Sequence, residues 1–152
     1  MKTLLILTIG FCLLLTSVPA MADQAADEAA MRKLREQDDA AFNKHDAKAM
    51  ANHNTENYVS WDGIGEGRQA FEKRMVEFFE SQKDVQGKEL ELIDITFLTP
   101  NVAIYMARSE QSNLLDADGK PLPPNKTLVA IVFVKKNGKW LFAADFDKEI
   151  EE

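Results

Sequence analysis

The sequence predicts an α+β fold in which N-terminal helices cover one face of a bent antiparallel sheet. Two observations support this. Between residues 24 and 82 apolar residues recur mainly at helical spacing, whereas from residue 88 onward they alternate as they do in strands. Helices followed by antiparallel strands are typical of a two-layer α+β domain. A chain of 152 residues suits one such domain.

The first 22 residues have the organisation of a secretory signal peptide. Lys2 supplies the basic start, Leu4–Leu15 is an apolar run too short to span a bilayer comfortably, and Ala20-Met21-Ala22 is a small-x-small cleavage pattern. We expect cleavage before Asp23 and export to the periplasm or the medium. An uncleaved anchor is the alternative. Residues 23–152 then form the domain.

Composition narrows the classes of function. Cys12 is the only cysteine and lies in the expected signal peptide, so the mature domain has no disulfide and no cysteine metal ligand. The chain has 25 acidic and 18 basic residues, a net charge of −7. This acidity argues against nucleic acid and anionic membranes as partners. The glycines at 63, 65 and 67 lack the Lys-Ser or Lys-Thr of a phosphate loop, and no cofactor is expected.

The first helix is expected over Gln24–Lys44. Alanines are frequent in it, and no glycine or proline interrupts it. Leu34 and Phe42 lie on its apolar stripe, and Asp38 falls between them at helical spacing. A carboxylate at that position is either tilted toward solvent at the edge of the stripe or buried with a partner.

A short helix, a strand and a third helix follow. Asp46 is a suitable N-cap for Ala47–Ala51. Tyr58–Trp61 reads as a strand that ends at Asp62-Gly63. The next helix, Arg68–Gln82, has an apolar stripe of Phe71, Met75, Phe78 and Phe79.

Four antiparallel strands complete the prediction: Lys88–Phe97, Val102–Asn113, Thr127–Lys135 and Lys139–Asp147. Thr127–Lys135 is apolar on both faces and should be central. Asn137-Gly138 is a strong hairpin signal. Residues 148–152 are expected to fray.

Alternation within these strands predicts their faces. In the first strand Leu90 and Leu92 point one way while Ile93, Ile95 and Phe97 point the other, so a bulge is expected near Leu92-Ile93. In the second strand Val102, Ile104, Met106 and Arg108 should face the concave side of the sheet. The last strand should present Trp140, Phe142, Ala144 and Phe146 on one face.

Four short motifs, in this order and spacing, resemble the SnoaL-like or DUF4440 (SgcJ/EcaC-type) branch of the NTF2-like superfamily. They are Phe42-Asn43-Lys44-His45-Asp46, Tyr58-Val59 with Asp62-Gly63, Gly67-Arg68-Gln69-Ala70-Phe71, and Asn137-Gly138-Lys139-Trp140. The resemblance covers nearly all of Asp23–Phe146. It implies a cone-shaped half-barrel with helices over its mouth, a hydrophobic pocket inside, and often a homodimer through the sheet.

That superfamily includes ketosteroid isomerase, limonene epoxide hydrolase and many binding domains, so fold alone does not decide function. The resemblance puts Asp62 at the position of the isomerase general base. It puts Asp38 at the position of the oxyanion tyrosine, and the oxyanion aspartate falls near Ala130 or Ile131. Both oxyanion donors are therefore replaced. Asp62 also suits an ordinary Asp-Gly turn.

Three hypotheses follow. In the first, the pocket binds a small, largely apolar molecule through Phe42, Tyr58, Trp61, Phe78, Arg108 and Trp140. In the second, the protein is an isomerase- or hydrolase-type enzyme that uses Asp38 or Asp62 as an acid–base group, with Arg108 as the partner of Asp38. In the third, the domain serves dimerisation or assembly without a ligand. Binding is favoured because no matched partner for a catalytic carboxylate is evident.

The two histidines of the chain do not predict a metal site. His45 is expected at a helix end and His53 in a polar loop, and their spacing with Asp46 matches no established ligand pattern. We therefore expect both to be solvated.

Overall fold

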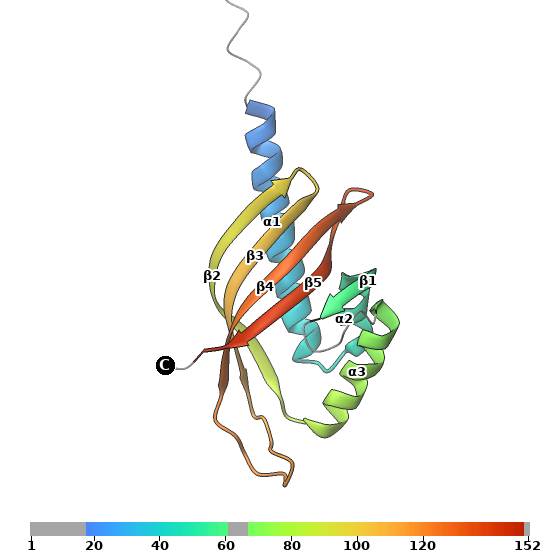
Figure 1. The fold of residues 1–152 in the computed structure, drawn as a ribbon, viewed down its shortest axis with the longest axis vertical. Coiled ribbons are helices and arrows are strands. Elements are labelled where there is room, and N and C mark those ends of the chain that lie inside the picture. The colour runs from blue at the N-terminus through green and yellow to red at the C-terminus, as the bar shows by residue number, and fades with distance from the viewer. Residues whose placement is uncertain (1–17, 61–66, 151–152) are drawn as a thin grey trace, which may run out of the picture.

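The computed structural model describes residues 18–60 and 67–150, with side chains from residue 23 onward (Figure 1). It confirms the expected α+β architecture. Most of the expected signal peptide, together with Trp61, Asp62 and most of the glycine bend, lies outside the described residues. The helices are α1 (Val18–Phe42), α2 (Ala47–His53) and α3 (Gly67–Ser81), and the strands are β1 (Asn54–Ser60), β2 (Gln86–Thr99), β3 (Val102–Ser112), β4 (Asn125–Lys136) and β5 (Lys139–Glu149).

The strands form one sheet with the order β1-β5-β4-β3-β2. Strands β2 to β5 are antiparallel as expected, whereas β1 joins the edge parallel to β5. The apolar strand β4 is central, in agreement with its sequence. Figure 1 shows α1 crossing the curved sheet, with α2, β1 and α3 gathered beside one half of it.

The expected bulge in β2 is present, because the register with β3 shifts between Leu92 and Asp94. Further shifts occur near Leu90 and Leu98. Each extra residue reverses the alternation of faces. Consequently Leu92, Ile95 and Phe97 all pack against the core, whereas Leu90 and Ile93 are exposed, which corrects the predicted faces.

The prediction for the faces of β3 is wrong. The buried side chains are Ala103, Tyr105, Ala107 and Ser109. Val102, Ile104, Met106 and Arg108 therefore lie on the convex face. Both alternating sets are largely apolar, so hydrophobicity alone cannot orient the strand. Packing decides instead, because the Tyr105 ring packs at a tilt against Phe133 with centroids 5.6 Å apart.

A bulge in β5 also corrects a predicted face. The register with β4 shifts between the pair Val132–Ala144 and the pair Phe133–Phe142. Trp140 and Phe142 are buried, but Phe146 is 40% exposed, so these residues do not share one face. Beyond the bulge Asp145 turns inward. Strand β5 also continues through Lys148 and Glu149, which corrects the prediction that the tail frays from residue 148.

The junction of α2 and β1 contains no polar loop. His53 is the last residue of α2, and the Asn54 N–H caps that helix by donating to the Ala51 carbonyl. Asn54 and Thr55 are buried at the start of β1. Asp46 caps the other end of α2 as predicted, with 2.9 Å between Ala49 N and Asp46 Oδ1.

The hairpin between β4 and β5 is confirmed, because Asn137 and Gly138 have φ of 52° and 77°, as a type I′ turn requires. Among the described residues, no helix is both long and apolar enough to cross a membrane.

Candidate functional site

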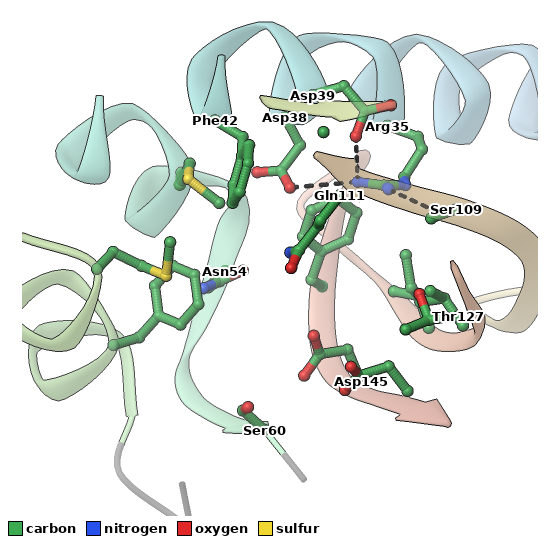
Figure 2. A pocket seen from close by; sticks show the side chains of 18 of the residues that line it. Arg35, Asp38, Asp39, Phe42, Asn54, Ser60, Ser109, Gln111, Thr127 and Asp145 are labelled. Carbon is green, nitrogen blue, oxygen red and sulfur yellow. Dashed lines mark hydrogen bonds and ion pairs between the residues drawn. The ribbon is translucent and has the colours of Figure 1, made fainter. Parts of the chain in front are cut away.

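A cavity of about 330 Å³ lies among α1, α2, α3, β1 and the concave face of the sheet (Figure 2). One wall is apolar and comes chiefly from the helices, with Phe42, Met50, Phe71, Met75 and Phe78. The facing surfaces are polar and include Arg35, Asp38, Asp39, Asn54, Tyr58, Ser60, Arg74, Ser109, Gln111, Thr127, Asp145 and Asp147.

Aromatic packing between α1 and α3 builds the apolar wall. Phe42 lies against Phe78 and Phe79, with centroids 6.2 and 5.3 Å apart. Phe71 meets Tyr58 of β1 edge-on at 5.1 Å. The predicted stripe of α3 therefore faces the core and the cavity together, and such edge-to-face pairs favour a defined geometry.

Asp38 of α1 lies at the polar side of the cavity and is only 9% exposed. Its Oδ1 is 2.8 Å from His53 Nδ1 at the end of α2. Its Oδ2 is 3.5 Å from a terminal nitrogen of Arg35, one turn earlier in α1. Of the two alternatives for Asp38, the structure therefore shows the one in which the carboxylate is buried with a partner.

Arg108 is not the partner of Asp38, contrary to the prediction. It lies on the convex face of β3, half exposed, and pairs with Glu91 of β2. Arg108 is not among the residues that line the cavity. The error follows from the reversed faces of β3.

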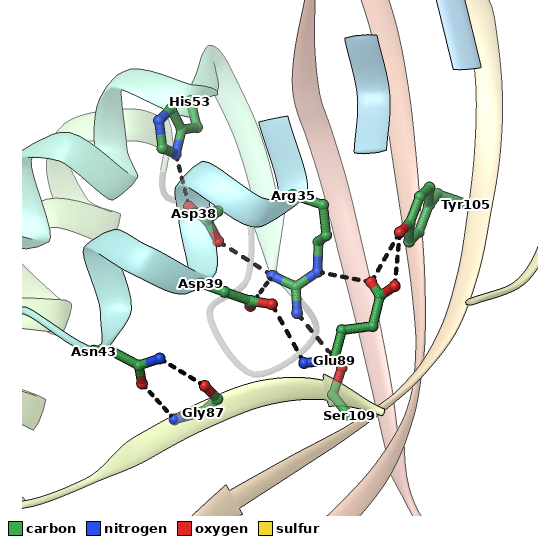
Figure 3. A network of polar contacts seen from close by, with 9 residues as sticks. All are labelled: Arg35, Asp38, Asp39, Asn43, His53, Gly87, Glu89, Tyr105 and Ser109. Carbon is green, nitrogen blue, oxygen red and sulfur yellow. Dashed lines mark hydrogen bonds and ion pairs between the residues drawn. The ribbon is translucent and has the colours of Figure 1, made fainter. Parts of the chain in front are cut away.

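Arg35 is the centre of a polar network that fixes α1 on the sheet (Figure 3). Its guanidinium lies 2.8 Å from Asp39 and 3.6 Å from Glu89 of β2. Glu89 also accepts a hydrogen bond from the Tyr105 hydroxyl at 2.8 Å. Because these contacts come from three elements, they set the rotation of α1 and thereby direct Asp38 toward the cavity.

The electrostatics of this network are unusual at Asp39. Burial raises the pKa of the Asp39 carboxyl and the charge of Asp38 adds to that effect, while Arg35 opposes both. Just after the C-terminal end of α1, the Asn43 side chain pairs with Gly87 of β2 through two hydrogen bonds of 2.8 and 2.7 Å.

Tyr58 and Asp145 form a second polar pair in the cavity wall. Burial, and then the hydrogen-bonded carboxylate of Asp145, raise the pKa of the Tyr58 phenol above its ordinary value. The phenol therefore stays protonated at neutral pH and serves as a donor. Sequence reasoning missed Asp145, because only the bulge in β5 turns it inward.

Four of the predicted site residues line the cavity: Asp38, Phe42, Tyr58 and Phe78. Trp140 does not. Its ring meets Phe97 edge-on at 6.1 Å, and its indole N–H donates to Asp27 of α1 at 2.9 Å. Trp140 is therefore a core residue that anchors α1. Trp61 and Asp62 lie outside the described residues.

The histidines have structural contacts rather than solvated positions. The His45 ring stacks on Phe79 at 4.6 Å, and its Nε2 is 3.1 Å from the Val85 carbonyl. His53 contacts Asp38 as described above. In residues 18–60 and 67–150, no group of three or more His, Cys, Asp or Glu side chains is arranged to hold a metal ion.

No protein-family model matches this sequence, and no curated protein matches it. Solved structures are similar. An uncharacterised protein with a cystatin-like fold from Caulobacter vibrioides has a TM-score of 0.71 at 17% identity, over 82% of this chain and 89% of the other.

Two further structures carry more informative names. An NTF-2 like protein of unknown function from Shewanella oneidensis has a TM-score of 0.61 at 15% identity, over 80% of this chain and 98% of the other. A ketosteroid isomerase-like protein from Erwinia carotovora atroseptica has a TM-score of 0.66 at 15% identity, over 82% and 96%. The chain thus has the NTF2-like fold. Its relation to the DUF4440 branch stays a prediction.

Proposed function

We propose that the protein binds a small organic molecule with an apolar, ring-sized body and a polar edge. The observation that carries this proposal is the division of one cavity into an aromatic wall and a polar wall with a fixed carboxylate, Asp38. The volume of about 330 Å³ is at the lower end of the range of about 300–1,000 Å³ common for ligand pockets. A compact molecule therefore suits it best.

The charged residues that line the cavity restrict the charge that the ligand can carry on its polar edge. Five acidic residues line the cavity, Asp38, Asp39, Glu110, Asp145 and Asp147, against three basic residues, Arg35, Arg74 and Lys88. The guanidinium of Arg35 is already engaged by Asp38, Asp39 and Glu89. An anionic ligand would be repelled by the remaining carboxylates, so a neutral molecule is favoured.

Binding of 1-indanone, a compact neutral ketone with two fused rings, tests the proposal. Saturation-transfer NMR should show contact between the protein and the probe. Met75→Trp should abolish the signal, because an indole at this position fills the cavity. Val76→Trp is the matched control, since Val76 is the next residue of α3 and is 45% exposed. Equal signals from the two variants, or none from the unaltered protein, would contradict cavity binding.

A second candidate function is acid–base catalysis by Asp38, favoured by its 2.8 Å contact with His53 at the cavity wall. A general base needs a fixed orientation, and His53 supplies it. One of the similar structures is named for ketosteroid isomerase, an enzyme class that moves protons next to a carbonyl.

This candidate is tested by proton exchange at C2 of 1-indanone in D₂O. Asp38 would take the C2 proton, the electron pair would move onto the ketone oxygen, and a solvent deuteron would return to carbon. The protein should accelerate exchange above the buffer rate, and Asp38→Asn should remove the acceleration while the probe still binds. Exchange at the buffer rate would leave binding as the function.

A further inference from the structure

We propose that Asn54 is the residue that selects the ligand, by donating a hydrogen bond from its side-chain amide to a neutral carbonyl oxygen. This inference rests on the proposed binding function and names the chemical class of the ligand: a compact ring compound that carries a ketone, lactone or amide carbonyl. Asn54 is not among the candidate site residues that the sequence predicts.

The backbone of Asn54 is fixed on both sides. Its N–H donates to the Ala51 carbonyl at the end of α2. Its carbonyl oxygen accepts two hydrogen bonds from the Arg68 guanidinium, at 3.0 and 2.5 Å. Arg68 can reach it because Gly67, with φ of 71°, lets α3 begin against β1, where a Cβ would lie 2.6 Å from the Glu56 carbonyl oxygen. The backbone that carries the Asn54 side chain is therefore held at one place in the cavity wall.

The amide nitrogen of Asn54 is a buried donor without an acceptor among the residues that the structure describes. The residue is 1% exposed, and no described protein atom accepts from its Nδ2. Asn54 is among the residues that line the cavity, where it lies on β1 (Figure 2). A buried donor that lacks an acceptor is costly in free energy, and such groups are rare in folded proteins. The cost is recovered when a ligand supplies the acceptor.

The surroundings define which acceptor fits. Asp38 and Asp145 line the same cavity, and their carboxylates disfavour an anionic oxygen. An amide N–H donor pairs well with the oxygen of a neutral carbonyl. The aromatic wall formed by Phe42 and Phe78 takes the rest of the molecule. Together these features point to a neutral carbonyl group on an apolar ring.

Two probes that differ only in the carbonyl group separate this inference from binding in general. Dissociation constants of 1-indanone and indane, in which CH₂ replaces the carbonyl, give a carbonyl preference for each protein variant. Asn54→Leu keeps the size of the side chain and removes the donor. The preference for 1-indanone should fall by roughly two- to tenfold in this variant, the range expected for one hydrogen bond.

Thr55→Val is the matched control, because Thr55 is the next residue of β1, is 4% exposed and is not among the cavity-lining residues. It should leave the preference unchanged. An unchanged preference in Asn54→Leu, with both probes bound, would overturn the role of Asn54 and leave the proposed function intact. Failure of both probes to bind the unaltered protein would instead overturn the proposed function.

The unaltered protein offers a test that does not depend on a folded variant. The two side-chain amide protons of Asn54 are resolved by ¹⁵N-edited NMR. On titration with 1-indanone one of them should move downfield, and titration with indane should not produce this shift. Equal responses to both probes would contradict the assignment of Asn54 as the carbonyl donor.

Discussion

The carboxylate of Asp38 lies 2.8 Å from Nδ1 of His53, and this contact joins the C-terminal part of α1 to the end of α2 at the cavity wall. Both side chains are largely buried, at 13% and 17% exposure. The same carboxylate faces Arg35 at 3.5 Å. Asp38 therefore combines two roles: it ties the helices together and it presents an acceptor to the cavity.

Asp38→Ala should destabilise the protein by about 3 kcal/mol, because the substitution leaves the largely buried His53 without its carboxylate partner and removes one of the three carboxylates around Arg35. Glu36→Ala, on the exposed side of α1, should stay within about 0.5 kcal/mol. Urea unfolding of the two variants measures the difference. A near-neutral Asp38→Ala would show that the carboxylate is not part of a buried pair.

The contribution of Asp27 to the free energy of unfolding should depend on pH. Burial opposes its ionisation, but hydrogen bonds from Lys135 and Trp140 and the charge of Lys135 outweigh burial and lower the Asp27 pKa below its ordinary 3.8. A lowered pKa in the folded state stabilises the protein above the unfolded pKa, and this contribution is lost as the pH falls through the folded pKa.

Asp27→Asn should therefore cost about 1.5–3 kcal/mol at pH 7, the range for hydrogen bonds to a charged group, and the cost should shrink below about pH 3.8. Denaturant unfolding at a series of pH values provides the measurement. Glu28→Gln, at the partly exposed neighbour of Asp27, is the control. A cost that is independent of pH would contradict the charge-assisted contact.

The order of the elements, the central strand β4 and the bulge in β2 could be predicted, because each leaves a periodic signal in the sequence. The bulge in β5 leaves none. Ala143 and Ala144 are small and apolar, so the sequence carries no sign of the register shift that separates Phe146 from Trp140 and Phe142 and turns Asp145 inward. In β3 both faces are apolar, so alternation alone does not show that Arg108 lies on the convex face.

The partners in the site depend on tertiary contacts that spacing does not encode. Asp38 was recognised as a carboxylate on an apolar stripe, yet its partner His53 was assigned to a loop, because the polar residues His53-Asn54-Thr55 resemble a surface segment. Burial of Asn54 and Thr55 reverses that reading. Trp140 is an aromatic residue of the kind that often lines a pocket. Its indole N–H instead donates to Asp27, more than a hundred residues earlier in the chain, and its ring is buried in the core.

We propose a homodimer through the convex face of the sheet. On this face three apolar residues of neighbouring strands form a row: Ile104 of β3 pairs with Val132 of β4, and Val132 pairs with Ala144 of β5. Their side chains are partly exposed. Phe146 of β5 is 40% exposed on the same face. An apolar surface of this kind is often covered by a second subunit.

Light scattering at micromolar concentration should give twice the mass of one chain. Val132→Lys should convert the protein to the monomer, while Val76→Lys, on exposed α3, should leave the dimer unchanged. A monomer for the unaltered protein would rule out this interface.

Export is a further proposal, based on the succession of Lys2, Leu4–Leu15 and Ala20-Met21-Ala22. The intact mass of the protein from its host should correspond to a chain that begins at Asp23 and is found outside the cytoplasm. Asp27 remains in that chain, so the contact between α1 and Trp140 is retained. A mass that includes Met1 in the mature protein would contradict export with cleavage.

Methyl NMR of methionine tests the central claim, ligand binding in the cavity, most directly. Met50 and Met75 line the cavity, whereas Met31 lies in the core away from it and Met106 lies on the convex face. In protein labelled with ¹³C at the methionine methyl groups, 1-indanone should shift the signals of Met50 and Met75 and show intermolecular NOEs to them, while Met31 and Met106 stay unchanged. Unchanged signals for Met50 and Met75 up to the solubility limit of the probe, or a shift confined to Met106, would contradict it.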